Sequence, residues 1–244
     1  MDVLAQSILA GYAGTREAAD PYCLRVGEAA ALLAGHPWRR FAVLGDSVAQ
    51  GVGDLVDGYL ELSWVDRIAA ELRASRRDMA YLNLGRRDAT AAQVAAEQLA
   101  EAVAFAADLA IVTCGGNDAL RPGYRPAEVD RELTGIVRAL QQRGTDVVTV
   151  SMLVLPHYPA VPVPLRPSVT RRLRTLAEHT AAVGAALDTL HVYLAEHPLC
   201  ADLDIYSADG LHGNVRTHAV GAAETIRRLG AHLGNAWPAG SSAT

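Results

Sequence analysis

The stretch FAVLGDSVAQGVG, residues 41–53, begins with four apolar residues and then changes abruptly to Gly45, Asp46 and Ser47. A short apolar run that stops at such residues is typical of a buried strand. The turn between a buried strand and a helix is one of the few places where a hydroxyl group is held rigidly and still reaches solvent. The stretch therefore predicts a strand that presents Ser47 at its carboxyl end.

The sequence on both sides of this stretch predicts the fold class. Short β-branched or aliphatic runs alternate with longer Ala, Leu and Arg-rich segments in which apolar residues recur at intervals of three and four. This alternation indicates a parallel sheet covered by helices on both faces. We expect five strands, at Arg40–Leu44, Met79–Leu84, Leu109–Cys114, Asp146–Leu153 and His191–Leu194. We expect crossover helices at 64–75, 91–106, 126–144 and 169–187.

The composition sets limits on the class of protein. The 244 residues are half apolar, which suits one large globular domain. The net charge of −5 comes from 22 basic residues, all arginine, against 27 acidic ones. This balance argues against nonspecific nucleic-acid binding. Three widely separated cysteines lack the short spacing of a metal or redox motif, so reduced thiols are expected. The sequence has no G-x-G-x-x-G or Walker motif, and no cofactor is expected.

The two ends of the chain lie outside the alternating pattern. The N-terminus has no basic segment before its apolar residues, and no run reaches 18 apolar residues, so a soluble cytoplasmic protein without a membrane partner is expected. Residues 1–38 are predicted to form a helical extension that packs on a main domain at 39–235. Residues 236–244 lack periodicity and are predicted to be disordered.

Four polar groups follow predicted strands, where open parallel sheets bind their ligands. They are GDS at 45–47, NLGRRD at 83–88, GGND at 115–118 and DGLH at 209–212. Each group taken alone has a structural explanation as a helix cap or a tight turn. Together, a Ser, an Asn and an Asp-x-x-His supply a nucleophile, an oxyanion donor, an orienting acid and a base.

This ordered set resembles the SGNH hydrolase superfamily, also called the GDSL esterases, over about residues 40–233. The most specific matches are GDSVAQGVGD, residues 45–54, and the DGLH group. The resemblance implies a flavodoxin-like α/β/α sandwich of three layers with a five-stranded parallel sheet. It also implies a metal-independent serine esterase that acts on a small-molecule ester. An α/β-hydrolase is less favoured, because the sequence has no Gly-x-Ser-x-Gly motif.

The chemistry assigns a role to each candidate residue. Ser47 would attack an acyl carbonyl, His212 would remove its proton, and Asp209 would orient the imidazole and stabilise its charged form. The oxyanion would be held by the Ser47 N–H, the Asn117 amide and a backbone N–H from the second polar group. Asp46 and Asp118 are assigned to turn and helix capping.

Asp88 departs from the family pattern, because most relatives have a glycine at the oxyanion position that it occupies. The backbone N–H survives this substitution, but a carboxylate about 6 Å from the oxyanion would oppose it by roughly 3 kcal/mol at an effective dielectric constant near 20. Three arrangements are open. Asp88 turns outward and pairs with Arg86 or Arg87, which we favour; Gly85 supplies the N–H in a shifted register; or the site has been repurposed.

Two further features have a structural and a functional interpretation. His218 lies in the last predicted helix, where a surface or capping role is favoured over metal binding because no matching ligands are present. The proline-rich segment at residues 155–167 suits an ordered loop that lines a pocket or simply connects two elements.

The favoured function is a serine esterase or acylhydrolase that cleaves a short-chain or acetyl ester through an acyl-Ser47 intermediate. An acyltransferase would use the same acyl-serine and differ only in how the closed site excludes water. The alternative from another class is a catalytically retired ligand-binding protein of the same fold. Asp88 and the unmatched first 38 residues favour retirement, whereas the intact Ser47, Asn117, Asp209 and His212 oppose it.

Overall fold

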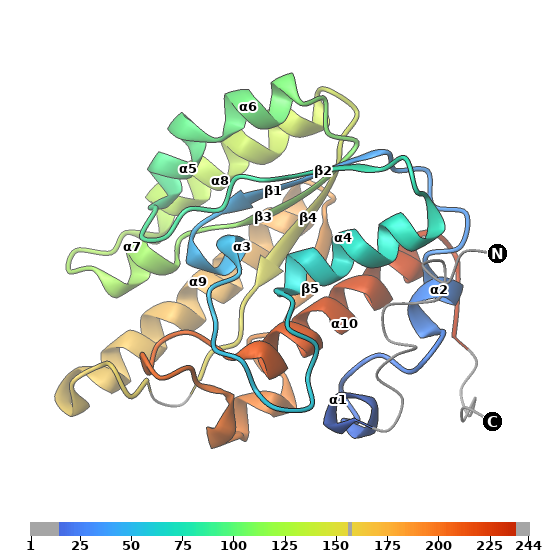
Figure 1. Ribbon diagram of the computed structural model, residues 1–244. Coiled ribbons are helices and arrows are strands. Elements are labelled where there is room, and N and C mark those ends of the chain that lie inside the picture. Colours follow the sequence, from blue (N-terminus) through green and yellow to red (C-terminus); the bar gives the residue numbers. More distant parts are fainter. Residues whose placement is uncertain (1–14, 156–157, 238–244) are drawn as a thin grey trace.

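The computed structural model describes residues 15–155 and 158–237, and its helices and strands alternate along most of the chain (Figure 1). The strands are β1 (Arg40–Gly45), β2 (Ala80–Asn83), β3 (Leu109–Thr113), β4 (Asp146–Ser151) and β5 (Leu190–Tyr193). The α-helices are α1 (Arg16–Ala19), α2 (Glu28–Leu32), α3 (Ser47–Gln50), α4 (Trp64–Ser75), α5 (Ala91–Glu97), α6 (Leu99–Ala104), α7 (Gly116–Leu120), α8 (Pro126–Gln141), α9 (Arg166–Ala186) and α10 (Val215–His232). Short 3₁₀ helices lie at Val163–Leu165, Pro198–Ala201 and Leu203–Ile205.

The five strands form one parallel sheet in the order β2-β1-β3-β4-β5. This is the flavodoxin-like order, in which the chain reverses its direction of winding between β1 and β3. The expected fold class is therefore confirmed. Each expected strand is present, with ends that differ by one or two residues. The largest difference is at β4, which ends at Ser151 and leaves Met152 and Leu153 to follow the sheet.

Alternate residues of the strands pack into separate cores on the two faces of the sheet. Phe41 and Val43 point toward α4 and α10, whereas Ala42 and Leu44 point toward the helices that cover the other face. Figure 1 shows α4 and α10 on one side of the sheet and α5, α6 and α8 on the other. Because both faces are covered, the strands read as continuous apolar runs in the sequence.

The helix expected at residues 91–106 is divided into α5 and α6 at Gln98, which caps one helix and precedes the other. The Gln98 side chain accepts a hydrogen bond from the Gly45 N–H at 2.8 Å and donates one to the Gly45 carbonyl at 2.9 Å. Gly45 ends β1 beyond the last residue that pairs with β2, and its carbonyl also accepts from the Arg86 N–H. The expectation of one uninterrupted helix is therefore wrong at Gln98, whose φ of −113° departs from helical values while its side chain bonds to the sheet.

Residues 15–38 are attached to the sheet layer by ion pairs between acids of this segment and arginines of α4 and α10. Glu17 pairs with Arg67, with both side chains less than a tenth exposed. The other two pairs are Asp20 with Arg216 and Glu28 with Arg227. Residues 1–14 and 238–244 lie outside the described residues, so the division into extension, main domain and tail stays a prediction.

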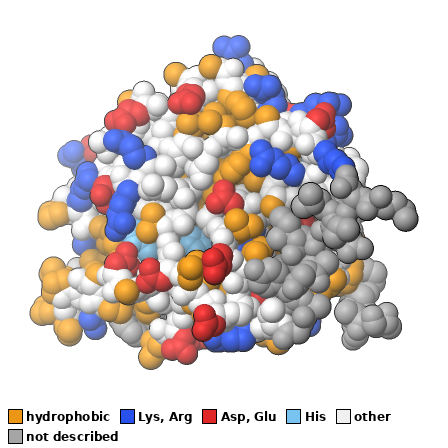
Figure 2. All heavy atoms as spheres, in the orientation of Figure 1, with side chains coloured by type: hydrophobic (Ala, Val, Ile, Leu, Met, Phe, Trp, Pro, Cys, Tyr) orange, Lys and Arg blue, Asp and Glu red, His pale blue; other side chains and the backbone are white. Residues whose placement is uncertain are grey.

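The surface drawn in Figure 2 carries arginine and carboxylate side chains interspersed over its described part, with histidine side chains visible between them. None of the helices in the described part of the chain is long and apolar enough to cross a membrane.

The buried Glu17–Arg67 pair makes a testable contribution to stability. Arg67→Met leaves the Glu17 carboxylate buried without its cation and is expected to lower the free energy of unfolding by about 3–5 kcal/mol. Arg39→Met is the matched control, because Arg39 and Asp78 form a pair that is exposed to water on both sides. The control is expected to cost less than about 1 kcal/mol. Urea denaturation measures both, and equal losses would contradict the proposed importance of the buried pair.

Candidate active site

The turn that carries Ser47 is determined by the close approach of β1 to β3. A Cβ atom on Gly45 would lie 2.0 Å from the Thr113 carbonyl oxygen, so only glycine fits at this position. Asp46 follows, and its side chain accepts a hydrogen bond from the Val48 N–H at 3.0 Å as the N-cap of α3. Ser47 is therefore the first residue of a helix that begins directly at the carboxyl end of a central strand, as predicted.

Burial raises the pKa of Asp46 to about 6, although its hydrogen bond from Val48 and the neighbouring His212 oppose this shift. The carboxyl group is almost fully inaccessible to water. A charged carboxylate loses its hydration there, so burial favours the protonated form. The capping role predicted for Asp46 agrees with its contact. Asp118 also accepts a cap hydrogen bond, but from Ala91 at the start of α5 rather than from its own helix.

The DGLH group lies in a loop that ends at α10. An antiparallel bridge between Tyr206 and Gly213 closes this loop, and the Ser207 N–H donates to the His212 carbonyl at 2.8 Å. Asp54 connects the loop to the segment that follows Ser47. Its N–H donates to the Ser207 hydroxyl, and its carboxylate accepts from the Ala208 N–H.

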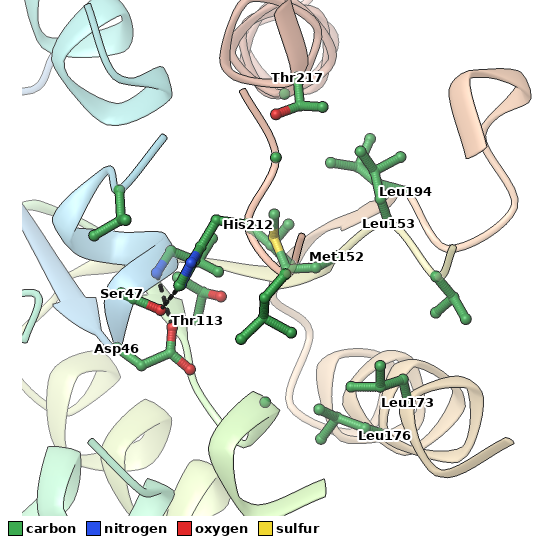
Figure 3. Close-up of a pocket in the computed structure, with 18 of the residues that line it drawn as sticks. Asp46, Ser47, Thr113, Met152, Leu153, Leu173, Leu176, Leu194, His212 and Thr217 are labelled. Atoms are coloured by element: carbon green, nitrogen blue, oxygen red, sulfur yellow. Dashed lines mark hydrogen bonds between the residues drawn. The ribbon is translucent and has the colours of Figure 1, made fainter. Parts of the chain in front are cut away.

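These contacts bring Ser47, His212 and Asp209 together. Figure 3 shows the first two of them side by side. The His212 Nε2 atom lies 2.7 Å from the Ser47 Oγ, across 165 residues of sequence. The His212 Nδ1 atom lies 2.6 Å from Asp209 Oδ2. Burial opposes ionisation of Asp209, but hydrogen bonds from His212 and from two backbone N–H groups hold its pKa at about 2.

Because Asp209 is ionised, it determines which nitrogen of a neutral His212 ring carries the proton. A carboxylate accepts hydrogen bonds and has none to donate, so the short contact requires a proton on Nδ1. The Nε2 atom then carries a free electron pair that faces the Ser47 hydroxyl. This is the tautomer in which an imidazole can remove a proton from serine.

Three N–H donors belong to residues that line the same cavity as His212. One N–H of the Asn117 amide donates to the Ala89 carbonyl at 3.1 Å, which orients the side chain and leaves its second N–H available. The backbone N–H groups of Ser47 and Asp88 donate to no acceptor among the described residues. All three residues line one cavity together with His212.

Asp88 is exposed and has a left-handed backbone, with φ of 64°. Glycine adopts this conformation without strain, and Asp is among the few other residues that tolerate it. The expected pairing of Asp88 with Arg86 or Arg87 is wrong. Arg86 pairs with Glu97 at 2.6 Å, and Arg87 lies 3.8 Å from Asp209, so both cations face other carboxylates.

Gly85, the alternative donor, has its N–H engaged by the Asn83 side chain at 2.9 Å. The same Asn83 side chain donates to the Ala49 carbonyl of α3. A Cβ atom at Gly85 would lie 2.2 Å from the Gln50 nitrogen, so this glycine allows the second polar group to approach the helix that begins at Ser47.

His218 is buried rather than on the surface, and it accepts a hydrogen bond from the Trp64 N–H at the start of α4. Burial lowers its pKa to about 4.

Gln98 and Asp54 were not predicted as site residues. Gln98 bonds to Gly45 before Ser47, and Asp54 bonds to the loop that carries His212. Asp54 ends the GDSVAQGVGD motif, which was its one visible signal, whereas Gln98 lies in an ordinary helical pattern.

A cavity of about 220 Å³ opens from Ser47 toward α9 and α10 (Figure 3). Leu155 and Tyr158 of the proline-rich loop contribute to its wall. Among the described residues, no three His, Cys, Asp or Glu side chains converge where they could bind a metal ion.

Comparison with known families agrees with this geometry. The profile of the GDSL-like lipase/acylhydrolase family matches residues 43–220, which is most of the chain and includes Ser47, Asn117, Asp209 and His212. No curated protein matches the sequence at a significant level.

Several solved structures have a similar fold. The lipase/acylhydrolase from Enterococcus faecalis is 21% identical, covers 80% of this chain and 96% of its own, and gives a TM-score of 0.62. The psychrotrophic esterase EstA from Pseudoalteromonas sp. is 17% identical, with 81% and 100% coverage and a TM-score of 0.62. The acetylxylan esterase Axe2 from Geobacillus stearothermophilus is 15% identical, with 80% and 94% coverage and a TM-score of 0.62. At these identities the likeness establishes the fold.

The raised pKa of Asp46 predicts a change in the pH dependence of stability. The folded state binds more protons than the unfolded state between pH 4 and pH 6, so the stabilising contribution is present below pH 4 and is lost as the pH rises through 6. Asp46→Asn keeps a capping side chain but removes this loss. Relative to the wild type, the variant is expected to gain about 3 kcal/mol of unfolding free energy between pH 4 and pH 7.

Urea unfolding at both pH values measures this gain. The control is Asp78→Asn, which changes an exposed carboxylate paired with Arg39. Its effect is expected to differ by less than about 1 kcal/mol between the two pH values. Parallel pH curves for Asp46→Asn and the wild type would show that Asp46 ionises normally.

Proposed function

Because the chain belongs to the GDSL-like lipase/acylhydrolase family, we propose that it is a serine esterase that cleaves a small-molecule ester through an acyl-Ser47 intermediate. The observation that carries this proposal is the 2.7 Å contact between the Ser47 Oγ and the His212 Nε2. Serine at its ordinary pKa is a weak nucleophile, and a base at hydrogen-bond distance activates it.

In the first step, the Ser47 Oγ attacks the acyl carbonyl while His212 Nε2 accepts the hydroxyl proton. The imidazolium that forms is stabilised by Asp209, which is ionised at neutral pH. His212 then donates this proton to the departing alcohol. Water attacks the acyl-serine in the second step, with His212 again acting as the base, and the acid product leaves.

The N–H groups of Ser47, Asp88 and Asn117 are proposed to stabilise the negative charge that develops on the carbonyl oxygen. Asp88 is preferred to Gly85 because the N–H of Gly85 already bonds to Asn83. Such donors are oriented before the reaction, and losing one of them typically costs about 10²–10³-fold in rate. The Ala89 carbonyl supplies this orientation for Asn117.

A catalytically retired binding protein of the same fold is the alternative. Such a protein needs a pocket but no aligned proton path. The continuous hydrogen bonds from Ser47 through His212 to Asp209 favour the esterase, because each of the two contacts is at most 2.7 Å long.

A fluorophosphonate probe tests the nucleophile. The wild type is expected to be labelled on Ser47, and Ser47→Ala is expected to lose labelling and to lower the rate of p-nitrophenyl ester hydrolysis by about 10⁴-fold or more. Ser168→Ala is the matched control, because the Ser168 hydroxyl only donates to the Leu165 carbonyl. Mass spectrometry of the labelled peptide gives the readout, and a wild type that takes up no probe would support the retired binding protein. Acceptor alcohols in the ester assay separate hydrolysis from acyl transfer.

Two variants of Asp88 test whether its carboxylate opposes the reaction. Glycine and asparagine both adopt the left-handed backbone found at Asp88, so Asp88→Gly and Asp88→Asn remove the charge without straining the chain. Because the carboxylate is exposed and water screens it, each variant is expected to stay within about fivefold of the wild-type kcat/KM. A rise of about a hundredfold in both would show that the carboxylate weakens the oxyanion site.

A further inference from the structure

The cavity that opens at Ser47 is apolar at the end distant from His212. Its wall there is formed by Met152 and Leu153, which follow β4, by Leu173 and Leu176 of α9, and by Leu194, which follows β5. Figure 3 shows these side chains in the space between α9 and α10, with Ser47 and His212 at the opposite side. One end of the cavity therefore meets Ser47, and the wall at the other end is mainly hydrocarbon.

Two of the hydroxyl groups that line the cavity donate their protons to backbone carbonyls. Ser151 donates to the Ala177 carbonyl at 2.7 Å, and Thr217 donates to the Asn214 carbonyl at 2.6 Å. A sugar or another polyol placed here would lose water without gaining equivalent hydrogen bonds, which is unfavourable. An alkyl chain loses nothing of this kind and gains from the burial of each methylene group. The occupant that fits the wall is an alkyl chain.

The size of the cavity sets the length of that chain. An apolar protein cavity of about 150 Å³ holds benzene, which has six carbon atoms. By the same ratio, the cavity of about 220 Å³ holds about nine carbon atoms, including the carbonyl beside Ser47. A two-carbon acetyl group would leave most of this volume empty, and a palmitoyl group would exceed it.

We propose that this cavity binds the acyl chain of the substrate, and that the preferred ester carries an acyl group of about six to eight carbons. The inference rests on the proposed esterase function and revises the short-chain or acetyl group that the sequence suggested. The alcohol part of the ester then lies at the polar end of the cavity, beside the exposed residues Arg87 and Asp88.

A series of p-nitrophenyl esters from acetate to palmitate tests the chain length. The kcat/KM is expected to be greatest for hexanoate or octanoate, with octanoate at least about tenfold above acetate because each buried methylene adds to binding. A kcat/KM that is highest for acetate and falls with each added carbon would overturn the inference.

Variants of Leu173 test the wall itself. Leu173→Trp fills part of the cavity and is expected to lower the octanoate-to-acetate ratio of kcat/KM by about tenfold. Leu173→Ala enlarges the cavity and is expected to move the optimum to longer acyl chains. This variant still tests the wall if Leu173→Trp does not fold. The control is Leu165→Trp, at an exposed residue just before α9, which is expected to keep the ratio within about twofold. Wild-type ratios in both Leu173 variants would contradict the assignment.

A binding measurement separates this inference from the proposed function. Octanamide and acetamide carry the acyl part of the substrate without an ester bond, and calorimetry on Ser47→Ala measures their binding without turnover. Octanamide is expected to bind at least about tenfold more tightly than acetamide and to lose this advantage in Ser47→Ala/Leu173→Trp.

The two proposals fail in different ways. Tight octanamide binding by a protein that hydrolyses no ester would refute the esterase and keep the apolar pocket. Hydrolysis that is best for acetate, with equal affinities for the two amides, would keep the esterase and refute the pocket.

Discussion

At Gly45 the chain passes so close to β3 that a side chain of any size would collide with the Thr113 carbonyl oxygen. This contact places the end of β1 against its neighbour at the point where the sheet changes its direction of winding, and α3 begins immediately afterwards. Gln98 completes the arrangement from the other side by bonding to both polar backbone groups of Gly45. Ser47 thus lies on a turn whose backbone is held by close packing against β3 and by hydrogen bonds to Gln98.

The imidazole reaches this turn through a short loop rather than through another strand. Asp209 accepts hydrogen bonds from two backbone N–H groups of its own loop and also bonds to the His212 ring, so one residue shapes the loop and orients the imidazole. Asp54 then joins the loop to the segment behind Ser47. Two hydrogen bonds of Asp54 thus hold this loop beside the Ser47 segment, so His212 reaches Ser47 although the two residues are far apart in sequence.

Burial determines the electrostatics around the site. It raises the pKa of Asp46 and lowers that of His218, so both shifts favour an uncharged group in the interior. Asp209 behaves differently, because its side chain is about one-third exposed and receives hydrogen bonds that favour its charge. Asp209 therefore provides an anion beside His212, whereas His218 stays uncharged at neutral pH beside the apolar cavity. The apolar wall next to Ser47 suits an alkyl chain.

Apolar runs and turn residues are local signals, and they were enough to predict the sheet from the sequence. Local motifs also marked Ser47, Asn117, Asp209 and His212 as candidate site residues and Asp46 as a helix cap. Which carboxylates face Arg86 and Arg87, the hydrogen bonds of Gln98 to Gly45 and the burial of His218 depend on tertiary packing. The cavity likewise depends on tertiary packing, because its wall combines residues after β4 and β5 with one face of α9. These contacts join residues that are distant in sequence, and their energies depend on three-dimensional packing that no local pattern records.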